Sequence, residues 1–152
     1  MLAPLAVVIL ACTGLAAAWL DLTARRLPNA LSAAVAVLGL LFSANSSDWA
    51  ATGSAALHAV IALLTGLALY SRGVIGGGDV KYYAAVAAWF PLATGFRLLG
   101  YVSLAGLGVV AGWYLCQRLL ARPDGTEPTA ASAQVPLGIA IAAGALLAAA
   151  IP

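Results

Sequence analysis

The sequence predicts an all-α integral membrane protein with six transmembrane helices. Hydrophobic residues fill 64% of the 152 positions and charged residues only 8%, whereas a soluble domain carries about 25% charged residues. The apolar residues fall into long runs, and none of these runs shows the alternation of a barrel strand. We therefore expect one integral membrane domain over residues 1–152, with the lipid bilayer as its solvent.

The six predicted helices follow one another with short breaks. A helix needs about 20 apolar residues to cross the hydrocarbon core, and the second and fourth runs are shorter than that. The runs cover residues 2–20, 28–43, 49–70, 80–92, 98–120 and 135–151. The first run has no basic segment ahead of it and is long enough to span, so we expect a retained helix rather than a signal peptide.

The breaks contain the residues that usually begin and end helices. Pro28 suits the first turn of the second helix. Ser47 or Asp48 suits the cap of the third. A glycine-rich loop, "SRGVIGGG", precedes the fourth helix, and residues 121–136 form the longest polar connection. The spacing of Gly108 and Gly112 favours close helix packing within the chain over dimerisation.

The positive charges predict how the helices are oriented. If successive spans alternate in direction, Arg97 lies alone on one side of the membrane. The six other Lys and Arg residues lie on the opposite side, namely Arg25, Arg26, Arg72, Lys81, Arg118 and Arg122. Cytoplasmic loops are enriched in Lys and Arg, so we expect both termini to face outward. Most of the tryptophans suit interfacial anchoring, and they are Trp19, Trp49, Trp89 and Trp113.

Several classes of protein are excluded by what the sequence contains. A net charge of +2, scattered along the chain, does not suit a nucleic-acid surface. Cys12 and Cys116 are far apart and form neither a disulfide framework nor a zinc motif. His58, within the third run, is best explained by packing or hydrogen bonding. We expect no cofactor.

Two aspartates reach the same side of the membrane from different helices. Asp21 ends the first predicted helix and Asp79 begins the fourth. Asp79 alone would suit a helix cap. Asp21 does not, because the dipole at a helix C-terminus disfavours an anion, and an i, i+4 pair with Arg25 is its other ordinary explanation. Ionisable groups at membrane depth are costly and usually functional.

A facing pair of aspartates predicts water-activating hydrolysis without a metal. Two close carboxylates share one proton, so the ionised one is a base for water and the protonated one donates to the carbonyl under attack. The glycines before Asp79, which are Gly76, Gly77 and Gly78, predict a backbone in conformations closed to other residues and room for an extended substrate segment.

"GGGDVK" resembles the GxGD motif of membrane aspartyl proteases, most closely that of the type IV prepilin peptidases. The stretch "DLTARRLPN", with Pro28 and Asn29, resembles the family's Asp–basic–apolar–Pro–Asn block. "VPLGIAIAAGAL" keeps the Pro and Gly that open the family's last helix, Pro136 and Gly138, with Leu137 where an aromatic residue is common.

The resemblance implies a GxGD aspartyl protease-like bundle in a bacterial inner membrane. It maps Asp21 and Asp79 onto the catalytic aspartates, Gly76 and Gly78 onto the loop glycines and Lys81 onto the lysine that follows. The implied reaction removes the basic leader of a prepilin or pseudopilin at the cytoplasmic face. The chain resembles the short form of Flp-type pilus systems, without the cysteine-bearing insertion of larger members, so methyl transfer is not expected.

Three other functions compete with this interpretation. A proton- or cation-coupled transporter or channel would more often place its acids near the midplane, with repeated halves. A metal-dependent transferase would need more ligands than two carboxylates and one distant histidine. A non-catalytic helical scaffold would leave Asp79 as a simple cap. The sequence does not indicate the oligomeric state.

Overall fold

The computed structural model describes residues 4–24, 27–45, 48–120 and 137–151. Within these ranges the chain is helical, and no strand is formed. The elements are α1 (Pro4–Ala24), α2 (Asn29–Ala44), α3 (Trp49–Tyr70), α4 (Gly77–Ala87), the 3-10 turn η1 (Leu92–Thr94), α5 (Gly95–Leu120) and α6 (Leu137–Ala150). The prediction of an all-helical protein is confirmed.

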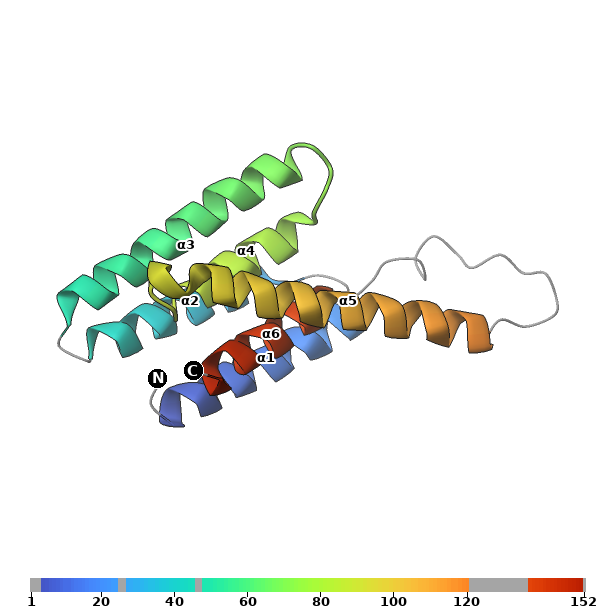
Figure 1. The fold of residues 1–152 in the computed structure, drawn as a ribbon, viewed down its shortest axis with the longest axis horizontal. Coiled ribbons are helices and arrows are strands. Elements are labelled where there is room, and N and C mark those ends of the chain that lie inside the picture. Colours follow the sequence, from blue (N-terminus) through green and yellow to red (C-terminus); the bar gives the residue numbers. More distant parts are fainter. Residues whose placement is uncertain (1–3, 25–26, 46–47, 121–136, 152) are drawn as a thin grey trace.

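Successive helices run back and forth along one bundle axis (Figure 1). The N- and C-terminal ends of the chain lie together at one end of the bundle, and α1 and α6 lie side by side. The last turn of α1 and the first turns of α2, α4 and α6 consequently meet at the other end. The second half of α5 extends beyond the remaining helices.

Three helical segments are long and apolar enough to cross a membrane, namely Pro4–Ala24, Trp49–Tyr70 and Leu92–Leu119. The apolar helices α2 and α6 are shorter. The predicted fourth span, residues 80–92, differs most from the structure. Helix α4 has 11 residues, so it rises only about 16 Å, roughly half the thickness of a hydrocarbon core.

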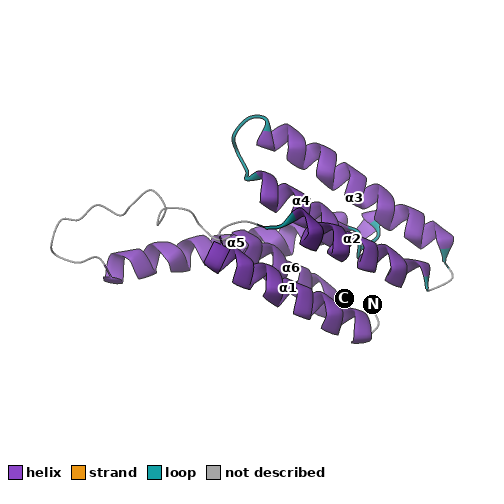
Figure 2. Ribbon diagram, turned by 180° about the vertical axis from the view of Figure 1, so that it is seen from behind, coloured by secondary structure: helices purple, strands orange, loops and turns teal. Residues whose placement is uncertain are grey.

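Helix α4 is short because protein surrounds it. Its residues from Ala84 to Ala87 are all buried, and α2, α3 and α6 pack around it (Figure 2). Backbone that leaves the helix at membrane depth is tolerated when protein encloses it. Here Trp89 and Phe90 continue the buried segment in a turn, with their amides donating to Val86 and Ala87.

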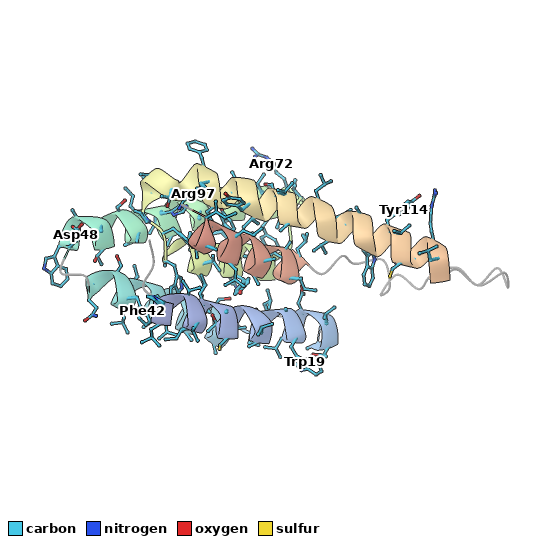
Figure 3. All side chains as sticks on the ribbon, turned by 60° about the horizontal axis from the view of Figure 1, so that its bottom comes forward. Trp19, Phe42, Asp48, Arg72, Arg97 and Tyr114 are labelled. Atoms are coloured by element: carbon cyan, nitrogen blue, oxygen red, sulfur yellow. The ribbon has the colours of Figure 1, made fainter. Side chains whose placement is uncertain are left out.

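Trp89 belongs to this core, so it is not one of the tryptophans that suit interfacial anchoring. It is 3% exposed, its indole nitrogen donates to the carbonyl of Val35 at 2.9 Å, and its ring stacks on Phe42 with centroids 5.6 Å apart. Trp19 and Trp49, by contrast, are 68% and 77% exposed. Trp19 projects away from the bundle (Figure 3).

Helix α5 packs on α6 through its first half only. Gly144 of α6 lies directly against the backbone of Val102, where a Cβ would come within 2.5 Å of the Val102 Cα. A Cβ on Gly108 or Gly112 would meet nothing within 4 Å among the described residues. Among the described residues, these two glycines therefore do not make the helix contact that was expected of them.

Candidate active site

Asp21 and Asp79 approach each other at the end of the bundle opposite the termini. Asp21 lies in the last turn of α1 and Asp79 in the first turn of α4. The two carboxylates are close enough that Asp21 raises the pKa of Asp79 by charge repulsion. The structure thus brings together the two acids that the sequence places on one side of the membrane.

Asp21 is held by the start of α6. The backbone amide of Gly138 donates to Asp21 Oδ2 at 2.8 Å. The first amides of a helix have no partner within it, and the N-terminal end carries a partial positive charge. A carboxylate that its own helix disfavours is therefore stabilised by the N-terminus of a different helix.

Asp79 lies at the third position of α4, just before the apolar residues of that helix begin. Burial raises its pKa, and repulsion from Asp21 raises it further, to about 6. Hydrogen bonds from the free amides of a helix start would lower the pKa of a carboxyl, and the upward shift shows that they do not dominate here. The simple capping explanation of Asp79 therefore loses support.

The glycines around the pair provide space rather than unusual backbone angles. A Cβ on Gly138 would lie 2.8 Å from Asp21 Oδ2, and one on Gly76 would lie 2.9 Å from Asp79 Oδ2. Among the described residues only Gly73, in the loop before α4, has a positive φ, of 70°. The expectation that the three consecutive glycines adopt conformations closed to other residues is therefore wrong.

Gly77 and Gly78 belong to the first turn of α4 and meet its neighbours. A Cβ on Gly77 would lie 3.3 Å from the ring of Tyr70 at the end of α3. A Cβ on Gly78 would lie 3.6 Å from the Cβ of Leu27, just before α2. The missing side chain of Gly77 therefore lets the first turn of α4 fit closely against α3, whereas a Cβ at Gly78 would make only an ordinary van der Waals contact.

A hydrogen bond between Lys81 and Asn29 links the two motif segments, "GGGDVK" and "DLTARRLPN". Lys81 Nζ donates to Asn29 Oδ1 at 3.0 Å. Pro28 precedes α2 as its N-cap in extended conformation, and its carbonyl accepts from Leu31. The hydrogen bond fixes the start of α2 against α4, on a different side of α4 from Asp79.

Other residues singled out from the sequence lie elsewhere. Asp48 caps α3, accepting from the amides of Ala50 and Ala51, at the end of the bundle near the termini (Figure 3). Buried His58 is bonded through Nδ1 to the carbonyl of Phe90 at 2.9 Å. Pro136 lies outside the described residues, as do three of the basic residues, Arg25, Arg26 and Arg122.

Sequence reasoning missed the partners of the motif residues. Nothing local to Asp21 indicates that its oxygen accepts from Gly138, because the two residues lie on the first and last helices. The contact between Lys81 and Asn29 is equally non-local. The described residues contain no group of three or more His, Cys, Asp or Glu side chains placed to hold a metal ion.

The comparison with protein families decides the classification. The model of the type IV leader peptidase family matches residues 8–111, more than half of the chain, and includes both aspartates. The chain belongs to the type IV leader peptidase family. Its membership makes it a peptidase of the leader peptidase class, whose substrates are prepilin-like proteins. Neither a curated protein nor a solved structure matches the chain.

Proposed function

We propose that this leader peptidase is an aspartic endopeptidase that removes the basic leader of a prepilin or pseudopilin, with Asp21 and Asp79 as its catalytic residues. The single observation that carries the proposal is the convergence of the two carboxylates at one end of the bundle, where Asp21 raises the pKa of Asp79. We expect Flp-type pilins to be the natural substrates.

The reaction uses one water molecule and one shared proton. The ionised aspartate takes a proton from the water as its oxygen attacks the peptide carbonyl carbon, and the protonated aspartate donates to the carbonyl oxygen. The resulting tetrahedral intermediate then collapses. The peptide C–N bond breaks as the leaving nitrogen takes the proton that the first aspartate removed from water. A hydroxyl of the intermediate returns its proton to the other aspartate as the new carboxyl group forms, so the pair regains its starting charge.

The amide of Gly138 has a supporting role in this scheme. Because it donates to Asp21 Oδ2, it stabilises the ionised form of that carboxyl and fixes its orientation. Burial favours the protonated form of Asp79. These opposite environments favour Asp21 as the base and Asp79 as the proton donor at the start of the reaction.

We further propose that all six helices are embedded in the bacterial inner membrane, with the termini outside and the aspartates at the cytoplasmic boundary. Three helices have the length and composition to span alone. The short helix α4 is enclosed by its neighbours, so it needs no span of its own. The pair then lies at the depth where a leader meets the hydrophobic helix of its substrate.

Leader removal by single variants tests the proposal. The chain is co-expressed with a Flp-type prepilin, and cleavage is followed by gel mobility. Asp21→Asn and Asp79→Asn should each lower cleavage by at least about 10³-fold, because general acid–base catalysis supplies factors of that order, while membrane levels of the protein stay unchanged. Asp48→Asn, at the opposite end, is the matched control and should cleave normally. Full cleavage by either catalytic variant would refute the assignment.

A further inference from the structure

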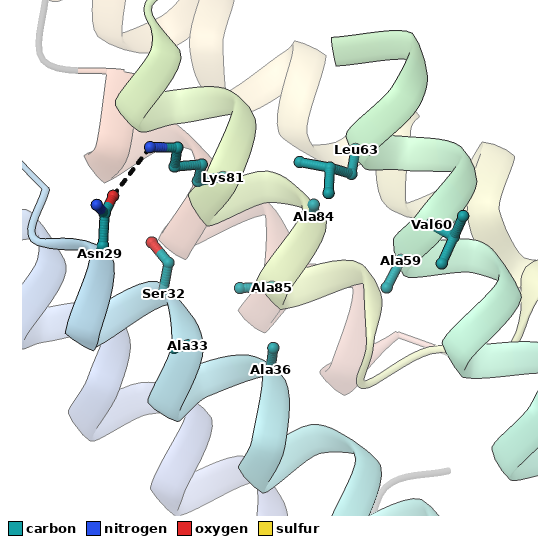
Figure 4. Close-up of a pocket in the computed structure, with 10 residues that line it drawn as sticks. All are labelled: Asn29, Ser32, Ala33, Ala36, Ala59, Val60, Leu63, Lys81, Ala84 and Ala85. Atoms are coloured by element: carbon teal, nitrogen blue, oxygen red, sulfur yellow. Dashed lines mark hydrogen bonds between the residues drawn. The ribbon is translucent and has the colours of Figure 1, made fainter. Parts of the chain in front are cut away.

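A cavity lies between α2, α3 and α4, away from the two aspartates (Figure 4). Its volume is about 330 Å³. Helix α4 contributes Lys81, Ala84 and Ala85 to the wall. Residues two positions apart on a helix point about 200° apart, so Lys81 and Asp79 use opposite faces of α4. The cavity is therefore distinct from the candidate active site.

One end of the cavity is polar and the rest is apolar. Asn29, Ser32 and Lys81 gather at the polar end, and alanine, valine and leucine side chains line the remainder (Figure 4). Such a lining suits a ligand with a polar head and a hydrocarbon tail, because each part of the ligand meets groups of its own kind.

The polar end has hydrogen-bonding capacity that the described residues do not satisfy. Ser32 is only 7% exposed, and its hydroxyl has no partner among them. A buried polar group without a partner is costly and indicates a missing ligand or water. Lys81 Nζ donates to Asn29 Oδ1, a neutral acceptor, and no carboxylate of the described residues pairs with its charge. An anionic group at this end of the cavity would compensate that charge and offer the Ser32 hydroxyl an acceptor.

The apolar part of the cavity suits a hydrocarbon chain. Its alanine-lined walls are formed by Ala33, Ala36 and Ala59, and an acyl chain needs no hydrogen-bonding partner from them.

The bilayer itself supplies such a molecule. Large apolar side chains are exposed on the helices beside the cavity, among them Val37 and Leu41 of α2 and Leu57 and Leu64 of α3. Val60, which lines the cavity, is itself 51% exposed. The cavity therefore opens on a surface that lipid covers, and Lys81 lies at the boundary end, where lipid headgroups are found.

We propose that this cavity binds one anionic glycerophospholipid. Its phosphate accepts hydrogen bonds from Lys81 Nζ, the Ser32 hydroxyl and the Asn29 amide, and one acyl chain fills the apolar part. The bound lipid holds the start of α2 against α4. The proposal does not depend on the catalytic role of the aspartates, so it is tested by binding alone and is measured equally well on Asp79→Asn.

Spin-labelled lipids measure the binding directly. The full chain is reconstituted in phosphatidylcholine nanodiscs, and labelled phosphatidylglycerol or phosphatidylcholine is titrated while the motionally restricted fraction is recorded. Phosphatidylglycerol should bind more tightly, because choline adds a positive charge beside Lys81. Lys81→Gln should weaken its binding about tenfold, since a charge-assisted hydrogen bond is lost. Arg118→Gln, with the same charge change on α5, should not.

Two further variants separate the headgroup contact from the cavity. Ala36→Phe fills the apolar part and should abolish the tightly bound fraction, whereas Ala111→Phe on exposed α5 should leave it unchanged. Ser32→Ala preserves the shape and should weaken phosphatidylglycerol binding several-fold, so it keeps the test valid if Ala36→Phe misfolds. Folding is checked by circular dichroism.

Three results would overturn the proposal. Equal affinity for the two lipids, unchanged in Lys81→Gln, would show that the site does not recognise an anionic headgroup. Loss of binding in Lys81→Gln but not in a folded Ala36→Phe or Ser32→Ala would place the lipid on the surface. Effective competition by glycerol 3-phosphate, which lacks acyl chains, would identify a site for a free phosphate group instead.

Discussion

Asp21 is stabilised by a helix to which it does not belong. The negative charge of Asp21 is unfavourable at the C-terminal end of the α1 dipole. The amide of Gly138, in the first turn of α6, donates to Asp21 Oδ2 at 2.8 Å. Asp79 stands at the positive end of its own helix, α4. Two helix N-termini therefore face the pair, and they offset part of the repulsion between two carboxylates that must stay close.

The protonation of Asp79 gives a first residue-scale prediction. Burial and Asp21 raise the pKa of Asp79 to about 6, so Asp79 should be protonated at pH 5 and ionised above pH 7. With its usual pKa of 3.8, Asp79 would be ionised at both pH values. The infrared band of its protonated carboxyl, identified by subtracting Asp79→Asn, should fade as the pH rises through about 6. Cleavage should slow over the same range, because the pair loses its shared proton.

Asp21→Asn checks the causes of that shift. The substitution removes the repulsion, so the pKa of Asp79 should fall, but burial is the larger cause and should keep it above its usual value. An unchanged titration in Asp21→Asn would show that the two carboxyls do not interact.

Gly138 gives a second residue-scale prediction. A Cβ at this position would lie 2.8 Å from Asp21 Oδ2 and 3.1 Å from Cγ, so Gly138→Ala should displace the carboxyl. A displacement of about 1 Å in a catalytic group lowers rates by about 100-fold. Prepilin cleavage should fall by that order in membranes with normal protein levels. Gly100→Ala, where a Cβ meets nothing within 4 Å, should cleave like the wild type.

At the scale of elements, α4 is the helix on which the arrangement depends. It carries Asp79 at its first turn and ends in the buried pair Trp89 and Phe90. Its neighbours approach closely at glycines. A Cβ on Gly66 of α3 would lie 2.6 Å from Val80, and one on Gly39 of α2 would lie 2.6 Å from the Trp89 ring. Small residues allow close helix approach inside membranes.

Gly39→Ala should therefore destabilise the bundle. The new methyl would overlap a tryptophan ring that is buried, stacked on Phe42 and hydrogen-bonded to Val35, and such overpacking costs about 1–3 kcal/mol. Thermal unfolding in detergent, followed by circular dichroism, should shift down by several degrees, at roughly 2–4 °C per kcal/mol for a chain of this size.

Gly53→Ala is the matched control for this change. It lies in α3, where a Cβ would meet nothing within 4 Å, and alanine stabilises an open helical position by about 0.5–1 kcal/mol relative to glycine. Its unfolding temperature should not decrease. Equal unfolding temperatures for Gly39→Ala and the wild type would mean that α2 and α4 separate without cost.

At the scale of the whole molecule, the alternating helices place the aspartates and the chain termini at opposite ends (Figure 1). The loop after α3 lies with the aspartates, and the loop after α2 lies with Asp48, near the termini. Positive charge predicts that the first of these ends faces the cytoplasm. The orientation is testable without any substrate.

Cysteine accessibility tests the orientation. In a background with Cys12→Ala and Cys116→Ala, Asn45→Cys and Ser71→Cys place single thiols at exposed positions after α2 and α3. A membrane-impermeant maleimide should label Asn45→Cys in intact spheroplasts and Ser71→Cys only after permeabilisation. The reverse pattern would place the aspartates outside the cell.

Features that depend on short stretches were predicted correctly from the sequence. Asp48 caps α3 as its position suggests, and Pro28, which was expected in the first turn of α2, lies one residue before that helix. Helix starts are predictable in this way because they are decided within a few residues. Predictions about what surrounds a residue were less accurate. Most of the tryptophans were expected at the interface, but Trp89 is in the core. Gly108 and Gly112 were expected to pack against another helix of the chain, but a Cβ at either position meets no described residue within 4 Å. In a chain this apolar, hydrophobicity does not distinguish lipid from protein neighbours.

The sequence by itself determined that the chain is helical, where most helices begin, and that two aspartates lie on one side, because composition, capping and charge act locally or add along the chain. Only the tertiary structure decided that α4 is an enclosed half-length helix, that Gly138 holds Asp21 and that Lys81 reaches Asn29. These contacts join residues far apart in sequence. They depend on how closely the helices approach, which the packing of the whole bundle sets.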